Sequence, residues 1–404
     1  MAAKVTGLRR IAVRRRTNGT TGAIAAALLL SLALSACGGG TPPAAPTSAP
    51  AAAPKPAQAG PTAAAAPAKP ADANPTAAAA PAKPAGANPT AAAAAAPQKA
   101  PAATPNVKPQ KWQMGTAPTG GTYYTLGAAI SKIVNSKVPG LQITAQVTPG
   151  SSVENLELLM ARESELGMSS AENLIDAMKS NKPWKTLRMA FSEHASVMHF
   201  IVRKDSGINS PCDYKGKRVA VGNPSSGMNN NNANVLSGAC GIAFKDMDTK
   251  QIHVDPGLQG IKDGNVDAVN IPTGVPVASV IETARTAPVK LLSLTPDQIK
   301  RLQQEFPFYS PITIPKGIYP GQDEDVHTVG AVTYMVTHDQ VDSEAVYWMT
   351  RSVFENLADL RASHPVGAEF SAEESVRRLD PMIKVGYEYQ PGAARYFKEI
   401  GLLP

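Results

Sequence analysis

The chain has 404 residues and a formal net charge of +7, with 39 Lys and Arg against 32 Asp and Glu. The positive charge is confined to the N-terminal part, because residues 1–37 carry +6 and residues 38–110 carry +4, which leaves −3 for residues 111–404. A mildly acidic domain without a stripe of Lys and Arg lacks the electrostatic footprint of a nucleic-acid-binding protein. We therefore expect no nucleic-acid partner.

Residues 1–37 have the features of an export signal. Six basic residues without an acid precede the apolar run Ala23–Leu34, which is too short to span a bilayer, since a spanning helix needs roughly 20 residues. The sequence that follows, Leu34-Ser35-Ala36-Cys37, resembles the lipobox of bacterial lipoproteins. This resemblance implies that Cys37 is lipidated and anchors an extracytoplasmic protein to a membrane. The alternative is an ordinary signal peptide with an incidental cysteine.

Residues 38–110 predict a disordered tether. A 14-residue repeat of mainly Ala and Pro starts at Pro61, again at Pro75 and, less regularly, at Pro89. Frequent proline interrupts each alanine run before a helix can nucleate, and the segment has no aromatic residue to build a core. If it is largely polyproline-like, such a segment reaches on the order of 200 Å, so the folded part is free to move away from the membrane.

Residues 111–404 contain a recurring unit, in which a β-rich run ends in a small polar loop and a helical pattern follows. The unit occurs five times, with the loops TGGT, TPGSS, SS, NPSSG and PTG, which begin at Thr119, Thr148, Ser169, Asn223 and Pro272. Strands that alternate with helices predict an α/β fold with parallel sheets, whose binding sites lie at the carboxyl ends of the strands.

The polar loops have two interpretations. Ser, Thr and Asn at a helix start can simply cap the helix by accepting hydrogen bonds from N–H groups without an intrahelical partner. Several helix N-termini that converge on one cleft can instead bind an anion, because they offer N–H donors and the positive ends of helix dipoles. Five loops together favour the second interpretation, with a carboxylate or similar small acid as the ligand.

The first of these loops, within Gly115–Thr122, has the glycine spacing of a phosphate-binding P-loop, but Gly121 stands where the lysine would be. The sequence also lacks a convincing apolar strand that ends in a magnesium-binding Asp. We therefore expect a neutral cradle of N–H and hydroxyl groups that binds an acid reversibly, rather than a nucleotide site.

Catalytic and metal-binding patterns are weak. The sequence has no G-x-S-x-G elbow and no H-E-x-x-H motif, and its six histidines lack metal-pair spacing apart from a loose His194–His199 pair. We expect both of these to be core or hinge residues, with Glu193 close enough to pair with either. We predict no catalytic residue, metal or cofactor. The alternative of a serine hydrolase would need a base within reach of its nucleophile, and its candidates are Ser151, Ser152, Ser225 and Ser226.

Several distinctive segments follow one another in the folded part: TGGTYYTLGAAISKIVN, SSVENLELL, ELGMSSAENLIDA, DYKGKRVAVG, FPFYSPITIPKGIYPGQDEDVHTVG and Gln390–Tyr396. They cover essentially all of residues 112–404 and resemble the TAXI family, the solute receptors of tripartite ATP-independent periplasmic (TRAP) transporters. The resemblance implies a periplasmic-binding-protein type II fold, with two α/β lobes joined by two hinge strands around the ligand. It also implies a receptor that binds a glutamate-like amino acid, dicarboxylate or related acid and delivers it to an integral-membrane permease. We expect a monomer.

The fourth loop departs from the family. The family usually has P-G-S-G-T where this chain has Pro224-Ser225-Ser226-Gly227-Met228, and the asparagine run Asn229–Asn232 follows. The chain lacks a hydroxyl at Met228 and has an additional amide at Asn229, so the identity of the ligand stays open. A ligand sensor for a membrane signalling partner, or a surface antigen, stays an alternative because fold does not fix function.

Within this fold we expect residues 110–198 and 338–404 to form lobe 1 and residues 199–337 to form lobe 2. The segment VMHFIVRKDSG predicts the strand that crosses into lobe 2, and Val329–Asp339 predicts the return. Two lobes joined by two strands exchange between open and closed forms, and a ligand that touches both stabilises the closed form.

The expected site joins the polar loops of both lobes. Lobe 1 is predicted to contribute Thr119, Gly120, Thr122, Tyr123, Ser151, Ser152, Asn155, Ser169 and Ser170, and lobe 2 to contribute Ser225, Ser226, Gly227, Asn229, Thr273 and Gly274.

A disulfide is also predicted. Cys212 precedes the strand KRVAVG, and Cys240 ends the helix after it. Because a strand and its following helix run antiparallel, the end of the helix returns to the start of the strand, and an exported protein folds in an oxidising compartment. The alternative is two buried free thiols.

Overall fold

The computed structural model describes residues 104–404. The predicted signal peptide at residues 1–37, its lipidation site Cys37 and the predicted tether as far as residue 103 lie outside the described residues. Val107 is buried against the core of the domain, within the range assigned to the tether. No helix in the described residues is both long and apolar enough to cross a bilayer.

Lobe 1 is built on a five-stranded part of the sheet with the order β2–β1–β3–β10–β4. β1 is parallel to both β2 and β3, whereas β10 is antiparallel to β3 and β4. The strands are β1 (Gln110–Gly115), β2 (Leu141–Gln146), β3 (Leu166–Ser170), β4 (Leu187–Arg203) and β10 (Val326–His338), with the short β11 (Glu388–Tyr389) beside β4.

Lobe 2 repeats this arrangement, with the order β6–β5–β7–β4–β8. Here β5 is parallel to β6 and β7, and β4 takes the antiparallel position between β7 and β8. The same order in both halves, with one antiparallel strand in each, is that of the periplasmic-binding-protein type II fold. The strands are β5 (Arg218–Ala220), β6 (Asp248–Lys250), β7 (Ala268–Thr273) and β8 (Val289–Leu291), with β9 (Ser310–Ile314) against β10.

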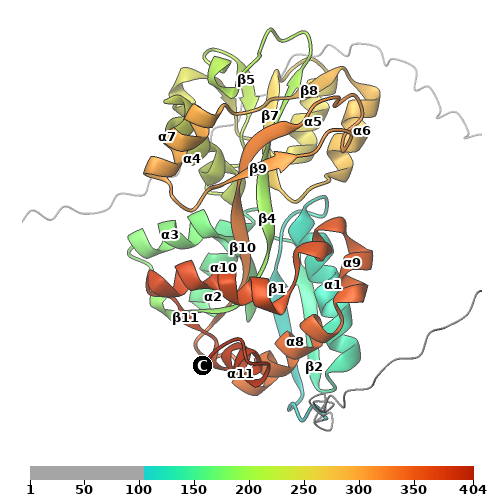
Figure 1. The fold of residues 1–404 in the computed structure, drawn as a ribbon, viewed down its shortest axis with the longest axis vertical. Coiled ribbons are helices and arrows are strands. Elements are labelled where there is room, and N and C mark those ends of the chain that lie inside the picture. The colour runs from blue at the N-terminus through green and yellow to red at the C-terminus, as the bar shows by residue number, and fades with distance from the viewer. Residues whose placement is uncertain (1–103) are drawn as a thin grey trace, which may run out of the picture. The chain divides into compact units, whose positions relative to one another are not determined.

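Two long strands, β4 and β10, run through both lobes (Figure 1). β4 pairs with β7 from Val197 onward, and β10 pairs with β9 up to Gly330 and with β3 from Thr333. The crossing points therefore lie near residues 196–197 and 330–333. Residues 331–337, which the sequence assigned to lobe 2, lie largely in lobe 1. The continuous apolar run of a strand buried on both faces gives no local mark of where one lobe ends.

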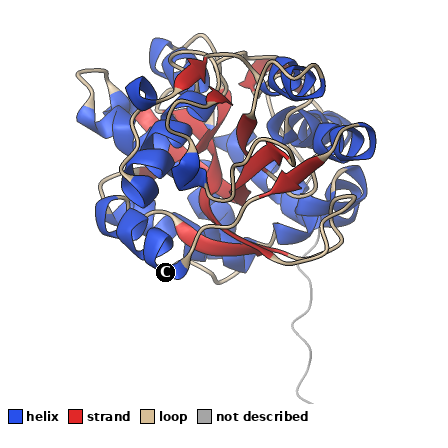
Figure 2. Cartoon of the chain, turned by 90° about the horizontal axis from the view of Figure 1, so that it is seen from above, coloured by secondary structure: helices blue, strands red, loops and turns tan. Residues whose placement is uncertain are grey.

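Helices cover both faces of the strands, as Figure 2 shows. Lobe 1 carries α1 (Thr122–Lys137), α2 (Ser152–Ala161), α3 (Ala171–Lys179), α8 (Ser343–Glu355), α9 (Leu357–Ser363), α10 (Ala372–Lys384) and α11 (Pro391–Glu399), and lobe 2 carries α4 (Gly227–Cys240), α5 (Val254–Lys262), α6 (Ala278–Thr286) and α7 (Pro296–Glu305). The four helices after β10 pack on lobe 1. Of these, α8 and α9 contact α1, whereas α10 and α11 contact β4.

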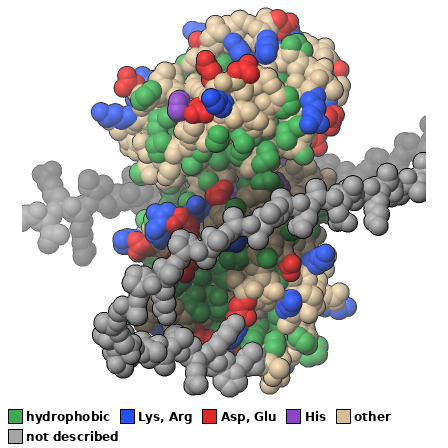
Figure 3. Space-filling view, turned by 45° about the vertical axis from the view of Figure 1, so that its right-hand side comes forward, with side chains coloured by type: hydrophobic (Ala, Val, Ile, Leu, Met, Phe, Trp, Pro, Cys, Tyr) green, Lys and Arg blue, Asp and Glu red, His purple; other side chains and the backbone are tan. Residues whose placement is uncertain are grey.

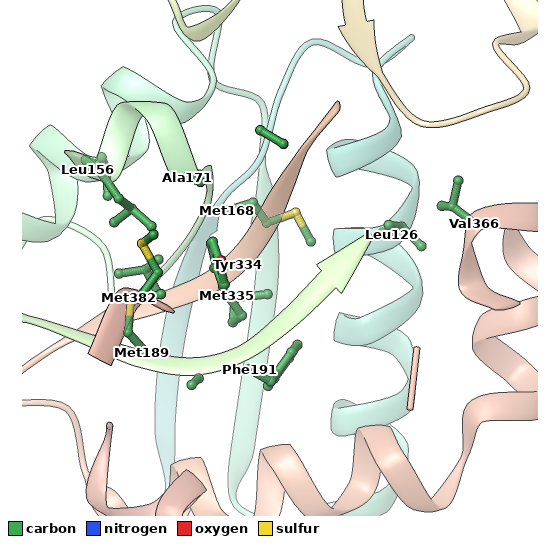
Figure 4. Close-up of a cluster of buried hydrophobic side chains, with 14 of the residues drawn as sticks. Leu126, Leu156, Met168, Ala171, Met189, Phe191, Tyr334, Met335, Val366 and Met382 are labelled. Atoms are coloured by element: carbon green, nitrogen blue, oxygen red, sulfur yellow. The ribbon is translucent and has the colours of Figure 1, made fainter. Parts of the chain in front are cut away.

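The core of lobe 1 forms between the sheet and its helices. Leu126 of α1, Met168 of β3, Phe191 of β4 and Met335 of β10 are fully buried in one cluster, which Figure 4 shows. Burying side chains of this size stabilises a fold by roughly 1.5–3 kcal/mol each. This packed sheet holds the strand ends, and hence the loops after them, in fixed positions.

Cys212 and Cys240, the two cysteines predicted to pair, are joined by a disulfide. Cys212 lies in the 3-10 turn Pro211–Asp213 before β5, and Cys240 is the last residue of α4. The bond therefore closes the β5–α4 unit, whose central loop faces lobe 1.

Candidate functional site

A cavity of about 330 Å³ lies between the two lobes. Lobe 1 contributes the starts of α1, α2 and α3, and lobe 2 contributes the starts of α4 and α5 and the end of β7. This volume is at the lower end of the range for small-molecule sites. The lining residues are Ala117, Pro118, Gly120, Gly121, Thr122, Tyr123, Ser151, Ser152, Ser170, Glu172, His194, Ser196, Ser226, Gly227, Met228, Asn231, His253, Val254, Asp255, Pro256, Ile271, Pro272, Thr273 and Val277.

The helix starts around the cavity are mostly uncapped. In the described part of the chain, the N-cap residues of α1, α2, α3 and α5 make no side-chain cap hydrogen bond. Ser226 is the exception, because its hydroxyl accepts from the backbone N–H of Asn229 at the start of α4. The capping interpretation therefore holds for Ser226, whereas four other helices present first-turn N–H groups that no N-cap side chain satisfies.

The lobes touch each other beside the cavity. The hydroxyl groups of Thr122 and Thr273 lie 2.9 Å apart, and the N–H of Gly274 donates to Thr122 Oγ1 at 3.2 Å. A backbone hydrogen bond of 3.1 Å joins the N–H of Gly227 to the carbonyl oxygen of Gly150. Direct bonds between lobes on these two sides show that the structure is a closed form.

The asparagine run makes a further contact between the lobes. The amide group of Asn230 donates to Asn173 Oδ1 at 3.2 Å, and that of Asn231 donates to Glu172 Oε1 at 2.6 Å. Tyr309 OH donates to Asn231 Oδ1 and fixes the orientation of that amide. The run that departs from the family pattern thus connects α4 of lobe 2 with α3 of lobe 1.

Glu172 is an acid of the cavity that sequence reasoning missed. Its side chain is 1% exposed, and Oε1 accepts from Ser170, Asn173 and Asn231, whereas Oε2 has no hydrogen-bond partner within residues 104–404. Burial raises the pKa of this carboxyl to about 7, although the hydrogen bond from Ser170 opposes the shift. An acid in the first turn of a helix is usually a solvated residue that interacts favourably with the helix dipole, so no local pattern indicates that Glu172 is buried.

His194 is fully buried in the hinge strand β4, as expected of a core or hinge residue, and it also lines the cavity. Thr333 Oγ1 donates to the His194 carbonyl oxygen at 2.9 Å and lies 3.1 Å from Nδ1. Within the described residues, Nε2 has no partner. Burial, together with the nearby charges of His364 and Arg378, lowers the pKa of His194 to about 3, so the ring is neutral at pH 7.

His199 and Glu193 lie away from the cavity lining. His199 is a core residue, as expected, with Nε2 2.8 Å from the hydroxyl of Tyr319 and Nδ1 facing backbone carbonyl oxygens. Glu193 pairs with neither histidine, and its carboxyl oxygens have no hydrogen-bond partner in the part of the chain that the structure describes. Burial raises the pKa of Glu193 to about 8.

The structure brings most of the predicted site residues to the cavity. Those that line it are Gly120, Thr122, Tyr123, Ser151, Ser152, Ser170, Ser226, Gly227 and Thr273. Those outside the lining are Thr119, Asn155, Ser169, Ser225, Asn229 and Gly274.

Each residue outside the lining has a local reason. Asn155 points into lobe 1, where its amide donates to the carbonyl oxygens of Thr116 and Met168 and ties α2 to the sheet. Ser169 faces away because neighbouring residues of a strand point to opposite sides. The other four are accounted for by their surroundings: Thr119 and Ser225 are exposed, the Asn229 amide donates to Gly222, and the Gly274 N–H donates to Thr122.

The start of α5 was missed entirely. Its residues His253, Val254, Asp255 and Pro256 line the cavity from lobe 2. The preceding strand, β6, is only Asp248–Lys250 and is polar, so this sixth strand–loop–helix unit lacks the apolar run that marked the others. The segment QIHVDPGLQG, with a Pro and an Asp ahead of a helical pattern, was the available signal.

The cavity has an unusual charge balance for an acid-binding site. Among residues 104–404, no Lys or Arg belongs to its lining, whereas Glu172 and Asp255 both do. On the face shown in Figure 3, charged side chains of both signs are dispersed over the two lobes without a basic patch. Any anionic group in the cavity must therefore be held by N–H groups and hydroxyls.

Comparison with known proteins gives one family and several distant structures. The model of the NMT1-like family matches residues 114–401. The alkanesulfonate-binding protein SsuA from Xanthomonas axonopodis pv. citri is 16% identical and covers 74% of this chain and 95% of its own, with a TM-score of 0.41. The periplasmic aliphatic sulphonate binding protein SsuA from Escherichia coli is 16% identical, the match covers 74% of this chain and 94% of that protein, and the TM-score is 0.39. For an ancestral arginine-binding protein the identity is 16%, the match covers 64% of this chain and 95% of that protein, and the TM-score is 0.38. Likenesses this distant carry no inference about the ligand.

Proposed function

Since this chain belongs to the NMT1-like family, we propose that it is an extracytoplasmic solute-binding receptor that captures a small carboxylate between its lobes. The ligand's carboxylate lies against the N-terminal turns of α1 and α2 from lobe 1 and α5 from lobe 2, whose N-cap residues make no side-chain cap hydrogen bond. Contacts from both lobes stabilise the closed form over the open one, which converts binding into a change of shape.

One observation carries this proposal, namely the cavity at the lobe interface with uncapped helix N-termini from both lobes. Such termini bind anions without a basic side chain, because N–H donors and helix dipoles supply the positive potential. A closed form needs roughly 5 kcal/mol of differential affinity to become dominant. Two or three charge-assisted hydrogen bonds supply free energy of this order.

We further propose that the receptor delivers its ligand to the membrane permease of a TRAP transporter and is held at the membrane through lipidated Cys37. The TAXI-like segments, from TGGTYYTLGAAISKIVN to Gln390–Tyr396, support the transporter assignment. A gene for a multi-spanning permease next to this one would support it further, whereas a gene for a membrane kinase would favour the alternative of a ligand sensor.

The geometry weighs against the serine-hydrolase alternative. Ser152 Oγ lies 3.4 Å from both Tyr123 OH and Ser170 Oγ, and Ser226 Oγ donates to the Asn223 carbonyl oxygen at 2.7 Å. Neither hydroxyl has a histidine as hydrogen-bond partner within residues 104–404. An ester and amide panel without turnover agrees with a binding protein.

A thermal-shift screen tests the proposal. Small mono- and dicarboxylates, amino acids and, as a control, amides of the same acids are added to the purified protein, and positives are titrated by calorimetry. We expect at least one acid to raise the melting temperature and its amide to have no effect, because the amide lacks the charge that the helix N-termini stabilise. A protein that none of these acids stabilises, or that binds amides equally well, contradicts the proposal.

A further inference from the structure

We propose that the cavity selects a monocarboxylate with an apolar tail over acids that carry a second carboxylate. The inference rests on the proposed function and deepens it, because it names the class of acid that the receptor binds. The carboxylate end of the ligand meets the helix N-termini, and the other end lies against an apolar wall of lobe 2.

Four residues of lobe 2 form this wall and line the cavity: Met228 of α4, Val254 of α5, Ile271 of β7 and Val277. All four belong to one hydrophobic cluster, in which Ile271 and Val277 are buried and against which Met228 and Val254 pack. The hydrophobic core of lobe 2 therefore continues to the surface of the cavity. A ligand group that covers this wall gains free energy by leaving water if the group is apolar.

Gly222, which follows β5, leaves room for Met228 in this wall. Its φ of 91° lies in the left-handed region, and a Cβ atom added to it would lie 2.8 Å from both Cβ and Cγ of Met228. Real Cβ atoms do not approach this closely, so glycine is required here for its conformation and for its size. The Met228 side chain is therefore a packed part of the wall.

Three polar side chains of lobe 2 that line the cavity already have partners. Ser226 Oγ donates to a carbonyl oxygen of the preceding loop at 2.7 Å, and Thr273 Oγ1 lies 2.9 Å from Thr122 Oγ1. The Asn231 amide donates to Glu172 and accepts from a tyrosine hydroxyl. These groups are therefore not free to hold a second carboxylate.

The charges of the lining also disfavour a second carboxylate. Within residues 104–404 the lining contains the acids Glu172 and Asp255 and no Lys or Arg. His194 and His253 belong to it as well, but burial lowers the pKa of both, so the neutral ring is the main form at pH 7. The start of α3 carries Glu172 in its first turn, which opposes an anion when it is ionised. Burying a carboxylate without a partner costs free energy.

Isosteric pairs of acids test the inference. 4-Methylpentanoate has an isopropyl group where succinate has its second carboxylate, and L-leucine differs from L-aspartate in the same way. Each acid is titrated by calorimetry into the purified full-length protein at one pH and salt concentration. We expect the apolar member to bind about 10- to 100-fold more tightly, as for burial of an aliphatic side chain. From propanoate to butanoate to pentanoate, each added methylene should raise the affinity about fourfold.

Two variants test the wall itself. Met228→Gln and Val254→Thr keep the approximate size of the side chain but make it polar, so each should reduce the preference for the apolar member several-fold. Met178→Gln is the matched control, because Met178 is also half-buried but lies on α3 outside the cavity lining. It should leave the preference unchanged. Melting curves without ligand confirm that the variants fold.

The outcomes separate the inference from the proposed function. A dicarboxylate that binds as tightly as its apolar partner, or a preference that Met228→Gln and Val254→Thr both leave unchanged, shows that the apolar wall does not select the ligand, and the receptor function stands. If no acid binds the parent protein, either in the thermal-shift screen or in these titrations, the proposed function fails and the inference fails with it.

Discussion

A Cβ atom placed on Gly227, at the start of α4, would lie 2.9 Å from the Cβ of Ser152 on α2 in the opposite lobe. Real Cβ atoms do not approach this closely, so the closed form requires glycine here. The lobe contact also uses the N–H of Gly227, which donates to the Gly150 carbonyl oxygen.

Gly227→Ala is therefore expected to weaken ligand binding without unfolding the protein. Overpacking costs typically 1–3 kcal/mol, and here it acts only on the closed form, so affinity should fall roughly ten- to hundred-fold. Alanine has the higher helix propensity, so the melting temperature without ligand should fall less than for a core defect. Calorimetry with the best acid measures the effect, and Ser237→Ala, in α4 but outside the cavity lining, is the control. Parent-like affinity in Gly227→Ala would mean that binding does not need this closed form.

Thr122→Ala should reduce affinity roughly ten- to hundred-fold, because a hydroxyl that meets the charged carboxylate of the ligand contributes roughly 1.5–3 kcal/mol. In the structure this hydroxyl contacts Thr273 and the N–H of Gly274. Thr122→Ser keeps the hydroxyl and should bind nearly as the parent does.

Ser226→Ala should also weaken binding, and in addition it removes the cap of α4, which costs about 1 kcal/mol of stability. Calorimetry gives the affinity and a melting curve gives the stability. If Thr122→Ala and Ser226→Ala both fold and both bind the acid as tightly as the parent, the ligand site has been placed wrongly.

The loops were predictable from the sequence, because a helix start rich in Ser and Gly after a strand is a local feature. Thr122, Ser152 and Ser226 were found in this way. Glu172, His194 and Asp255 were not, because their burial depends on how two lobes meet, and neither lobe alone shows it. Asn155 was also predicted to belong to the site, yet its amide satisfies two carbonyl oxygens inside lobe 1. The fold class was predicted from strand–helix alternation and a family resemblance, whereas the lobe boundary inside a continuous apolar strand was not.

Loss of the Cys212–Cys240 bond should lower the free energy of unfolding by about 3–4 kcal/mol, since the bond closes a loop with a sequence separation of 28. Cys212→Ser and Cys240→Ser should show this loss in denaturant titrations under oxidising conditions. Thiol labelling of the denatured, unreduced Cys37→Ser variant should find no free thiol. Two labelled thiols would contradict the disulfide in the exported protein.

The buried Glu193 should make stability depend on pH. Its pKa is raised to about 8 in the folded protein, so the unfolded chain loses this proton at lower pH than the folded chain does. The free energy of unfolding therefore falls as pH rises from the ordinary glutamate pKa to about 8. Below pH 6.5 the buried His194 and His199, with lowered pKa values, give the opposite slope, so the window from pH 6.5 to 8 is the informative one.

Across that window the parent should lose on the order of 2 kcal/mol from Glu193 and a smaller amount from Glu172, whose pKa is raised to about 7. Glu193→Gln should keep only the smaller loss. The matched control is Glu374→Gln, because salt bridges to Arg377 and Arg378 lower the Glu374 pKa to about 2, which leaves the slope above pH 6.5 unchanged. Denaturant titrations at pH 6.5 and 8 provide the numbers. Equal slopes in the parent and Glu193→Gln would show that this carboxyl ionises normally.

Native mass spectrometry of the protein as purified, without added ligand, tests the central claim most directly. The account predicts a species heavier than the chain by the mass of one small molecule, which is released on denaturation and identified as a carboxylic acid, and which Gly227→Ala retains less well. Two results would contradict a carboxylate held between the closed lobes. One is a released molecule that has no acidic group. The other is an acid that the double variant Gly227→Ala/Thr122→Ala retains as well as the parent does.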